Sequence, residues 1–420
     1  MRKRYLILYV LQAIYDTGKI FMDEIKIVFK DSGVVIFFFV VPFLYPLLYS
    51  WLYNNETARD IPAAVIDDSH TPTSRDFIRR LDATEGLDIM YHINSLEEGK
   101  ELMMRQKCRA LIHLPSSFTA DILNGRQATV SLYVDMSGML YYKSAVMSLT
   151  NLTVDMWEKI QLKTQTGNFT ARDEELSVRP LTYEAVPIFN PAGGYGSFLL
   201  PAVLMLIIQQ TLLLGIGLSA GTIREKNKYS LLVPIMQHYN GPLRIVFGKA
   251  MCYFMVYLLS SAYITMVIPN LFHFIQLASF KDIITILIPY ILACIFFGMT
   301  ISSLIRYREN VILVVVFASV PLLFLSGVSW PGSSIHGTWK AVSTLFPSTY
   351  GINAFIKLNS LGADISDVQH EFRCLWIQAG IYFLTACLVY WRQIYLSIHF
   401  RGLNSFQRAE RRRGRGELRV

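Results

Sequence analysis

The residues best able to do chemistry in this sequence are a few acids and histidines that form no recognisable catalytic set. Asp67, Asp68 and His70 stand together where a strand-like run ends, a position in which carboxylates commonly cap the next helix. His92 and His113 fall inside strand-like runs and are interpreted as sheet residues. No Ser–His–Asp set and no His, Cys and acid cluster has suitable spacing, so we expect no catalytic residue and no metal site.

The sequence also lacks a nucleotide-binding loop. A P-loop reads G-x-x-x-x-G-K-[ST]. The nearest candidate, 241–249, has six residues between its glycines and no Ser or Thr after the lysine. We therefore expect no cofactor on this chain, and any energy drawn from a nucleotide must come from a partner.

The chain is dominated by apolar segments. Of its 420 residues 53% are apolar and 17% charged, against about 25% charged in soluble domains. Six windows of roughly 20 residues lack Asp, Glu, Lys and Arg, which is the length of helix that crosses the ~30 Å hydrocarbon layer. They are approximately 33–53, 196–219, 250–270, 283–305, 310–329 and 375–391. The sequence therefore predicts a membrane α-helical bundle of six transmembrane helices.

The most polar groups inside these windows are Gln209 and Gln210, with Ser260, Ser261 and Thr265 in the next one. Two interpretations remain open: the glutamines hydrogen-bond across helices, or they line a substrate pathway. The windows contain no ionisable side chain and no inverted repeat, which argues against a proton- or ion-driven carrier.

The distribution of charge predicts the orientation. With both termini in the cytoplasm, the inside segments hold 21 basic and 8 acidic residues, and the outside segments hold 18 basic and 23 acidic. This arrangement satisfies the positive-inside rule. The basic tail 401–420 then lies beside anionic lipid, and nucleic acid is not an expected partner.

A polar stretch with a different texture separates the first two windows. Strand-like runs such as IPAAVIDD and CRALIHLP alternate with runs of helical spacing, which predicts an inserted α/β domain with a mixed sheet that ends in a long helix. The predicted organisation is 1–32 (cytoplasmic, with an interfacial helix), 33–53 (first span), 54–190 (extracytoplasmic domain), 191–400 (five further spans) and 401–420 (tail). A disulfide between Cys108 and Cys374 is left open.

Two short cytoplasmic segments are amphipathic. KIFMDEIKIVFK places Phe21, Ile25 and Val28 on one face with Lys19 on the other, as expected of a helix lying flat at the interface. The stretch 221–244 joins two apolar segments and carries four Lys and Arg residues, with an apolar patch around Pro234. It is shaped to dock on another protein, although a plain interfacial loop would read the same way.

The order of elements resembles a permease subunit of the ABC-2 family, the type-2 or type V ABC exporters. After the second span, REKNKYSLLVP (224–234) is similar to a cytoplasmic motif of that family. Lys228-Tyr229 stands here in place of the motif's usual small Gly-Thr pair. A family turn beyond the fifth span resembles SGVSWP (326–331), followed by FPSTY (346–350) and a later Leu-Gly (361–362). The outside domain is similar to the subgroup that works beside membrane-fusion proteins, through the matches DS (68–69), SRDF (74–77) and LPSSF (114–118).

The resemblance implies a coupling element at 222–245 that contacts a separate ABC ATP-binding subunit, helped by the interfacial helix. It also implies outer re-entrant helices at 331–362, a second permease copy or homologue, an optional membrane-fusion adaptor and location in the plasma (inner) membrane. The coupling residues would be Arg224, Glu225, Lys226, Leu231, Leu232 and Pro234, and the outer segment would contain Trp330, Pro331, Trp339, Pro347 and Tyr350.

Uncharged spans favour a hydrophobic or amphipathic cargo such as a drug or lipid. Two alternatives to an exporter remain. One is an ABC mechanotransmitter through whose spans no substrate passes, and the other is a membrane-anchored receptor whose outside domain binds a ligand.

Overall fold

The computed structural model describes residues 2–164, 188–190, 193–226, 228–238, 240–302, 305 and 307–416. The chain forms two compact units, one made of 1–54 with 195–420 and the other of 55–194. Part of the predicted inserted domain, 165–187, and the positions Asn227 and Tyr239 of the predicted coupling element lie outside the described residues.

The first unit is helical. Its elements are α1 (Arg2–Lys30), α2 (Ser32–Val35), α3 (Val41–Leu52), α9 (Tyr195–Glu225), α10 (Val233–Met236), α11 (Gly241–Ala262), α12 (Ile268–Leu271), α13 (Phe280–Ile301), α14 (Arg308–Leu325), α15 (Gly337–Ser343), α16 (Pro347–Asn359) and α17 (Gln369–Gly416). Single π-helical turns, Ile36–Val40 and Tyr263–Val267, continue α2 into α3 and α11 into α12.

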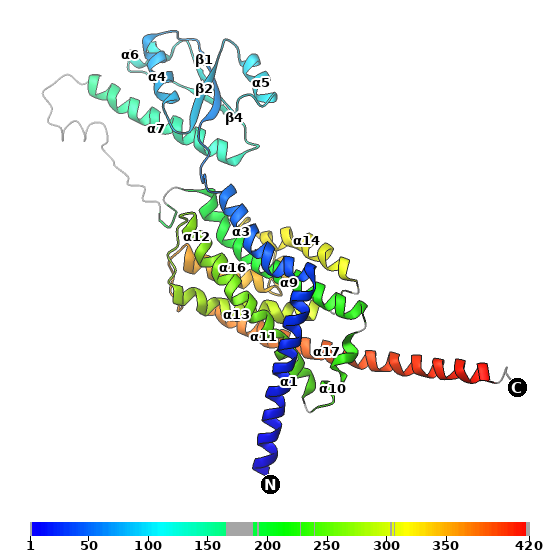
Figure 1. The fold of residues 1–420 in the computed structure, drawn as a ribbon. Helices are drawn as coiled ribbons and strands as arrows, with labels where there is room; N and C mark the ends of the chain where they lie inside the picture. The colour runs from blue at the N-terminus through cyan, green and yellow to red at the C-terminus, as the bar shows by residue number, and fades with distance from the viewer. Residues whose placement is uncertain are drawn as a thin grey trace. The chain divides into compact units, whose positions relative to one another are not determined.

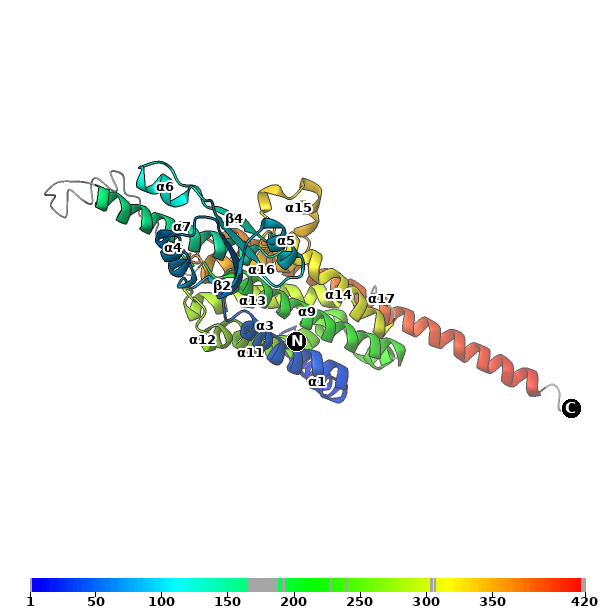
Figure 2. The same ribbon diagram turned by 90° about the horizontal axis from the view of Figure 1, so that it is seen from above.

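Within the described residues, six helices are long and apolar enough to cross a membrane: Ser32–Leu52, Tyr195–Glu225, Gly241–Leu271, Phe280–Ile301, Arg308–Leu325 and Gln369–Ser397. The predicted membrane helical bundle with an inserted α/β domain is therefore confirmed. Both views place α1 against α11 and α14 against α9 (Figures 1 and 2). The spans formed by α9 and α13 are mostly buried inside the unit, whereas those of α3, α14 and α17 are largely exposed on its outside.

Glycines allow α9 to pack closely on its neighbours. A Cβ added at Gly215 would lie 1.8 Å from the ring of Phe38, and one at Gly217 would lie 2.4 Å from Val311. Phe38 is fully buried and also makes edge-on ring contacts with Tyr253 and Tyr257 of α11. The first span thus depends on a side-chain-free patch of α9.

The second unit is a four-stranded mixed sheet with helices on both faces (Figure 1). The strands β1 (Ile61–Asp67), β2 (Leu87–Ile93), β3 (Ala110–Leu114) and β4 (Ser131–Val134) lie in the order β2-β1-β3-β4. The β1–β2 and β1–β3 pairs are parallel, and the β3–β4 pair is antiparallel. The helices are α4 (Pro72–Asp82), α5 (Leu96–Met104), α6 (Phe118–Leu123) and α7 (Met139–Thr164). The predicted mixed sheet is present.

Two hydrophobic clusters hold this sheet. Ala63 and Val65 of β1 pack with Phe77 and Leu81 of α4 on one face. Ala64 and the neighbouring buried residues of the other face pack with α5. Cys108 and Cys374 are both free thiols, Cys108 being completely buried.

The inserted unit leaves and rejoins the helical unit at adjacent points. Tyr53, just after α3, and Tyr195, the first residue of α9, have ring centroids 5.8 Å apart. Gly196 lies so close to the Tyr53 carbonyl that an added Cβ would be 2.7 Å from it.

Candidate functional site

Between α9 and α11, the described residues 228–238 form a short, partly exposed projection. It contains a 3-10 turn, Lys228–Leu232, followed by α10, in which Pro234 occupies the first turn, where a missing N–H is tolerated. Leu231 is 71% exposed. Leu232 and Val233 are only partly exposed and pack against the core. Of the apolar residues among the predicted coupling residues, Leu231 and Pro234 are exposed and Leu232 packs inward.

One aromatic side chain anchors this projection to the bundle. Tyr229 is buried, and its ring lies edge-on to Tyr390 of α17, with centroids 6.2 Å apart. Tyr229, which stands where the resembled ABC-2 motif has a small residue, therefore points inward and packs against α17.

The end of α9 is tied to the connection between α13 and α14. Arg224 donates to the Ile305 carbonyl at 3.2 Å, and the Glu225 carboxylate accepts from the backbone N–H of Arg308 at 3.0 Å. Lys226 is exposed and follows the last turn of α9. The predicted pair Arg224 and Glu225 thus links two membrane helices besides flanking the projection.

Helix α1 is longer than the predicted interfacial segment and buries further side chains besides the predicted apolar face. Lys19 is exposed, Phe21 and Ile25 are half-buried, and Val28 is buried, so the predicted apolar face does lie against the bundle. The same face also buries the acids Asp16 and Glu24, which sequence reasoning missed. Their spacing of eight residues could have revealed them, because it returns to the same side of a helix.

Three acids along α1 and its end pair with bases from distant helices. Asp16 accepts from Arg244 at 2.6 Å and contacts His238 at 2.9 Å. The Glu24 carboxylate accepts from Lys249, Tyr253 and Ser219, and both Glu24 and Lys249 are 2% exposed.

The third pair is formed by Asp31, just after α1, and Arg308 of α14. Asp31 receives two hydrogen bonds from the Arg308 guanidinium, at 2.6 and 2.9 Å, and one from Thr222 at 3.0 Å. Asp31 also caps α2. Since α1 meets α11 and Asp31 meets α9 and α14, one row of carboxylates connects the N-terminal helix to three membrane helices.

This row corrects one sequence inference. The third span was expected to begin at 250, free of ionisable groups, but α11 begins at Gly241 and buries Arg244 and Lys249 in the same helix. Charges can be buried there because each has an acidic partner from α1, and an unpaired buried charge would be strongly unfavourable.

The two intramembrane glutamines have different surroundings. Gln209 is fully buried, accepts from the backbone N–H of Ser348 at 2.7 Å and donates to the Ser348 hydroxyl at 3.2 Å. Ser348 lies in the first turn of α16, so Gln209 supplies an acceptor for one of the free N–H groups of that helix. The Gln210 amide nitrogen is buried without a hydrogen-bond partner in the described part of the chain.

The predicted outer segment contains the two short helices α15 and α16 after a 3-10 turn, Gly332–Ser334. Trp330 and Trp339 are more than half exposed, and Pro331 is exposed before the turn. Pro347 begins α16 and is buried, whereas Tyr350 is half-buried, with its ring edge-on to His370.

A comparison with protein families identifies the chain. The model of the ABC-2 family transporter proteins matches residues 33–388, from the first span through most of the last membrane helix. The chain belongs to the ABC-2 transporter family. It is accordingly a multi-pass membrane subunit of an ABC transporter, and membership of the family implies association with an ABC ATP-binding subunit. No curated protein matches the chain.

Proposed function

We propose that this subunit is the permease of an ABC exporter, worked by a separate ATP-binding subunit that contacts the projection 228–236. The observation that carries the proposal is the contrast between two side chains in the first turn of this projection. Leu231 is 71% exposed, whereas Tyr229, two residues earlier, is buried against α17. A partner that binds at Leu231 would therefore move a segment that Tyr229 fixes to the bundle.

The ties around the projection indicate how such a movement spreads. Arg224 and Glu225 connect α9 to the connection before α14, and the acids of α1 connect to α9, α11 and α14. Charged hydrogen bonds of this kind hold geometry more firmly than neutral ones. The helices would then shift as a group around α9.

The finer features of the proposal follow the charge pattern and the apolar spans. The protein lies in the plasma (inner) membrane. Both of its termini are in the cytoplasm, as the positive-inside rule favours. ATP is bound by the partner, and two copies of the permease, or one copy and a homologue, enclose the pathway. The cargo is hydrophobic or amphipathic, and a membrane-fusion adaptor receives it outside.

The test is purification of the full chain from its native membranes, with ATP hydrolysis and co-purifying polypeptides as readouts. Leu231→Asp should abolish co-purification of an ATP-hydrolysing subunit, since a charge replaces the exposed apolar contact. Leu345→Asp is the matched control, because Leu345 is 57% exposed at the outer segment, and it should leave the association intact. An ATPase retained by Leu231→Asp, or lost equally in both variants, would refute the assignment of the projection.

A further inference from the structure

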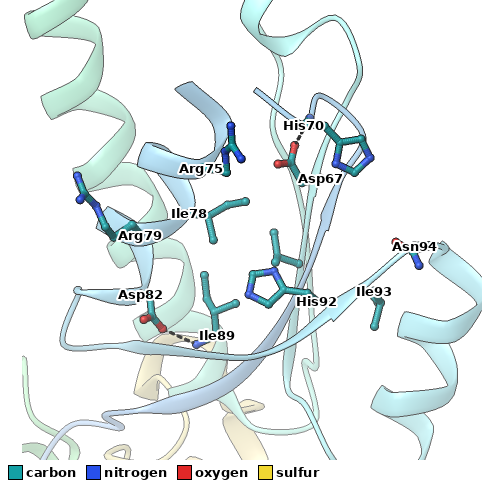
Figure 3. Close-up of a pocket in the computed structure, with 11 residues that line it drawn as sticks. Asp67, His70, Arg75, Ile78, Arg79, Asp82, Ile89, His92, Ile93 and Asn94 are labelled. Atoms are coloured by element: carbon teal, nitrogen blue, oxygen red, sulfur yellow. Dashed lines mark hydrogen bonds between the residues drawn. The ribbon is translucent and has the colours of Figure 1, made fainter. Parts of the chain in front are cut away.

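The inserted unit contains a pocket of about 480 Å³ between α4, β2 and the connection after β1 (Figure 3). This volume falls within the range of small-molecule sites. The pocket lies beside the carboxyl ends of two parallel strands, since His70 follows β1 and Asn94 follows β2. In sheets with parallel strands, ligands bind outside the carboxyl ends of the strands.

The floor of the pocket is apolar. Val65 of β1 and Ile78 of α4 are buried, and Ile89 of β2 is half-buried. Figure 3 shows Ile78 and Ile89 facing each other across the space between α4 and β2. Such a surface suits the apolar body of a ligand.

A bulge in β2 turns a polar side chain onto this floor. Ala63 pairs with Ile89 and the next residue, Ala64, pairs with Tyr91, so Met90 is an extra residue in β2. As a result Ile89 and His92 both lie on the α4 side of the sheet, although three positions apart would normally mean opposite faces. Bulges are rare between parallel strands and are often found next to binding sites, where they redirect a side chain.

The two acids of the pocket already have hydrogen-bond partners. Asp67 accepts from the backbone N–H groups of Ser69 and His70, each at 3.1 Å, and from the Ser74 hydroxyl at 2.7 Å. Asp82 accepts from the backbone N–H of Ile89 at 2.8 Å. The carboxylates thus shape the walls.

Arg75, a cation of the pocket, differs from the neighbouring arginines of α4 in its hydrogen bonds and ion pairs. Arg79 is held by Asp76 at 2.6 Å, and Arg80 is held by Asp76 at 2.7 Å and Asp155 at 3.7 Å. The Arg75 side chain makes no hydrogen bond or ion pair with any described residue. A planar guanidinium in this state is suited to a carboxylate, sulfonate or phosphate group.

We propose that this pocket binds a small soluble amphipathic anion, with its apolar body on Val65, Ile78 and Ile89 and its charged group on Arg75. His70 and His92 also line the pocket, where their ring nitrogens can bond to the ligand's polar atoms. This binding site belongs to the inserted unit alone and does not depend on the proposed coupling to an ATPase.

The experiment uses the full chain in nanodiscs of phosphatidylcholine and measures binding of 1-naphthoate by equilibrium dialysis, with empty nanodiscs as the blank. We expect saturable binding of one naphthoate per chain. Acetate lacks the rings, and 1-naphthylmethylammonium has the opposite charge, so each should bind at least ten-fold more weakly.

Arg75→Gln should weaken naphthoate binding at least ten-fold, whereas Arg80→Gln, on the same helix but outside the pocket, should change it less than two-fold. Absence of saturable binding, equal binding of the cationic probe or equal losses in both variants would overturn the proposal. Replacing part of the lipid with phosphatidylglycerol should leave binding unchanged. Competition by that lipid would show that a headgroup, not a soluble anion, is the occupant.

Discussion

The Glu24 carboxylate and the Lys249 ammonium form an ion pair in which each side chain is only 2% exposed. The two residues are more than two hundred positions apart, and Tyr253 and Ser219 donate further hydrogen bonds to the same carboxylate. The pair therefore joins α1, α9 and α11 at one buried point.

Removing one member of this pair should destabilise the protein strongly. Lys249→Met leaves the Glu24 charge buried without its partner, and a broken buried pair costs about 3–5 kcal/mol. We expect a much lower midpoint of thermal unfolding in detergent and poor recovery of the variant from membranes.

The double variant Glu24→Gln with Lys249→Met is the matched control for that charge effect. It removes both charges together, and replacement of a whole buried pair is often close to neutral. A double variant as unstable as Lys249→Met would show that the charges are not the cause. Lys26→Gln, which changes an exposed lysine of α1, should have little effect.

The adjacent glutamines should respond differently to the same substitution. Gln209→Leu removes the acceptor of the Ser348 N–H at the start of α16 and should destabilise by about 1–3 kcal/mol, the penalty for a buried group left unsatisfied. Gln210→Leu should be neutral or stabilising, because the Gln210 amide nitrogen is already unsatisfied within the described structure. Thermal unfolding in detergent compares the two, and equal losses would contradict the cap assigned to Gln209.

Gly215 should not tolerate even one methyl group. In Gly215→Ala the new carbon would overlap the ring of Phe38, and overpacking of this kind costs about 1–3 kcal/mol. Gly380→Ala in α17 meets no atom within 4 Å and should stabilise by about 0.5–1 kcal/mol through helix propensity. Unfolding midpoints of the two variants should shift in opposite directions, and a shared direction would refute the close contact.

Asp135 should make the stability of the inserted domain depend on acidic pH. Hydrogen bonds from Ser137, its hydroxyl first and then its backbone N–H, and from Arg109 lower the pKa of Asp135 to about 2 from its ordinary 3.8. A lowered native pKa gives stability that is present above the ordinary value and is lost as the pH falls from about 4 towards 2.

Hydrogen exchange of β3 and β4 amides in the full chain measures this effect. Asp135→Asn should exchange faster than the native chain at pH 7, and the difference should vanish near pH 2. A difference that grows as the pH falls would reverse the sign and contradict the assignment.

The sequence was sufficient for the architecture where local pattern decides it. Apolar windows located the spans, and the run around IPAAVIDD predicted β1 because its alternation with helical segments is local information. The cap of α4 is different: it is Thr71, whose side chain accepts from the Ser74 N–H, and not one of the acids Asp67 and Asp68 considered from the sequence.

The features that the sequence did not predict depend on contacts with residues that are remote in the sequence. The start of α11 was placed too late because Lys249 reads as a loop residue until Glu24 is known to lie against it. The inward position of Tyr229 is decided by Tyr390, and the extra residue Met90 in β2 is apparent only from its pairing with β1. Each of these features belongs to the candidate sites, where tertiary contacts override local preference.

The rings of Tyr53 and Tyr195 lie next to each other, close to the positions where the chain enters and leaves the inserted unit. A short glycine-rich bridge could therefore join them directly and leave the six-helix scaffold with its native backbone path. The inserted unit can therefore be exchanged for another domain joined at these two positions, without a change in the backbone path of the membrane helices.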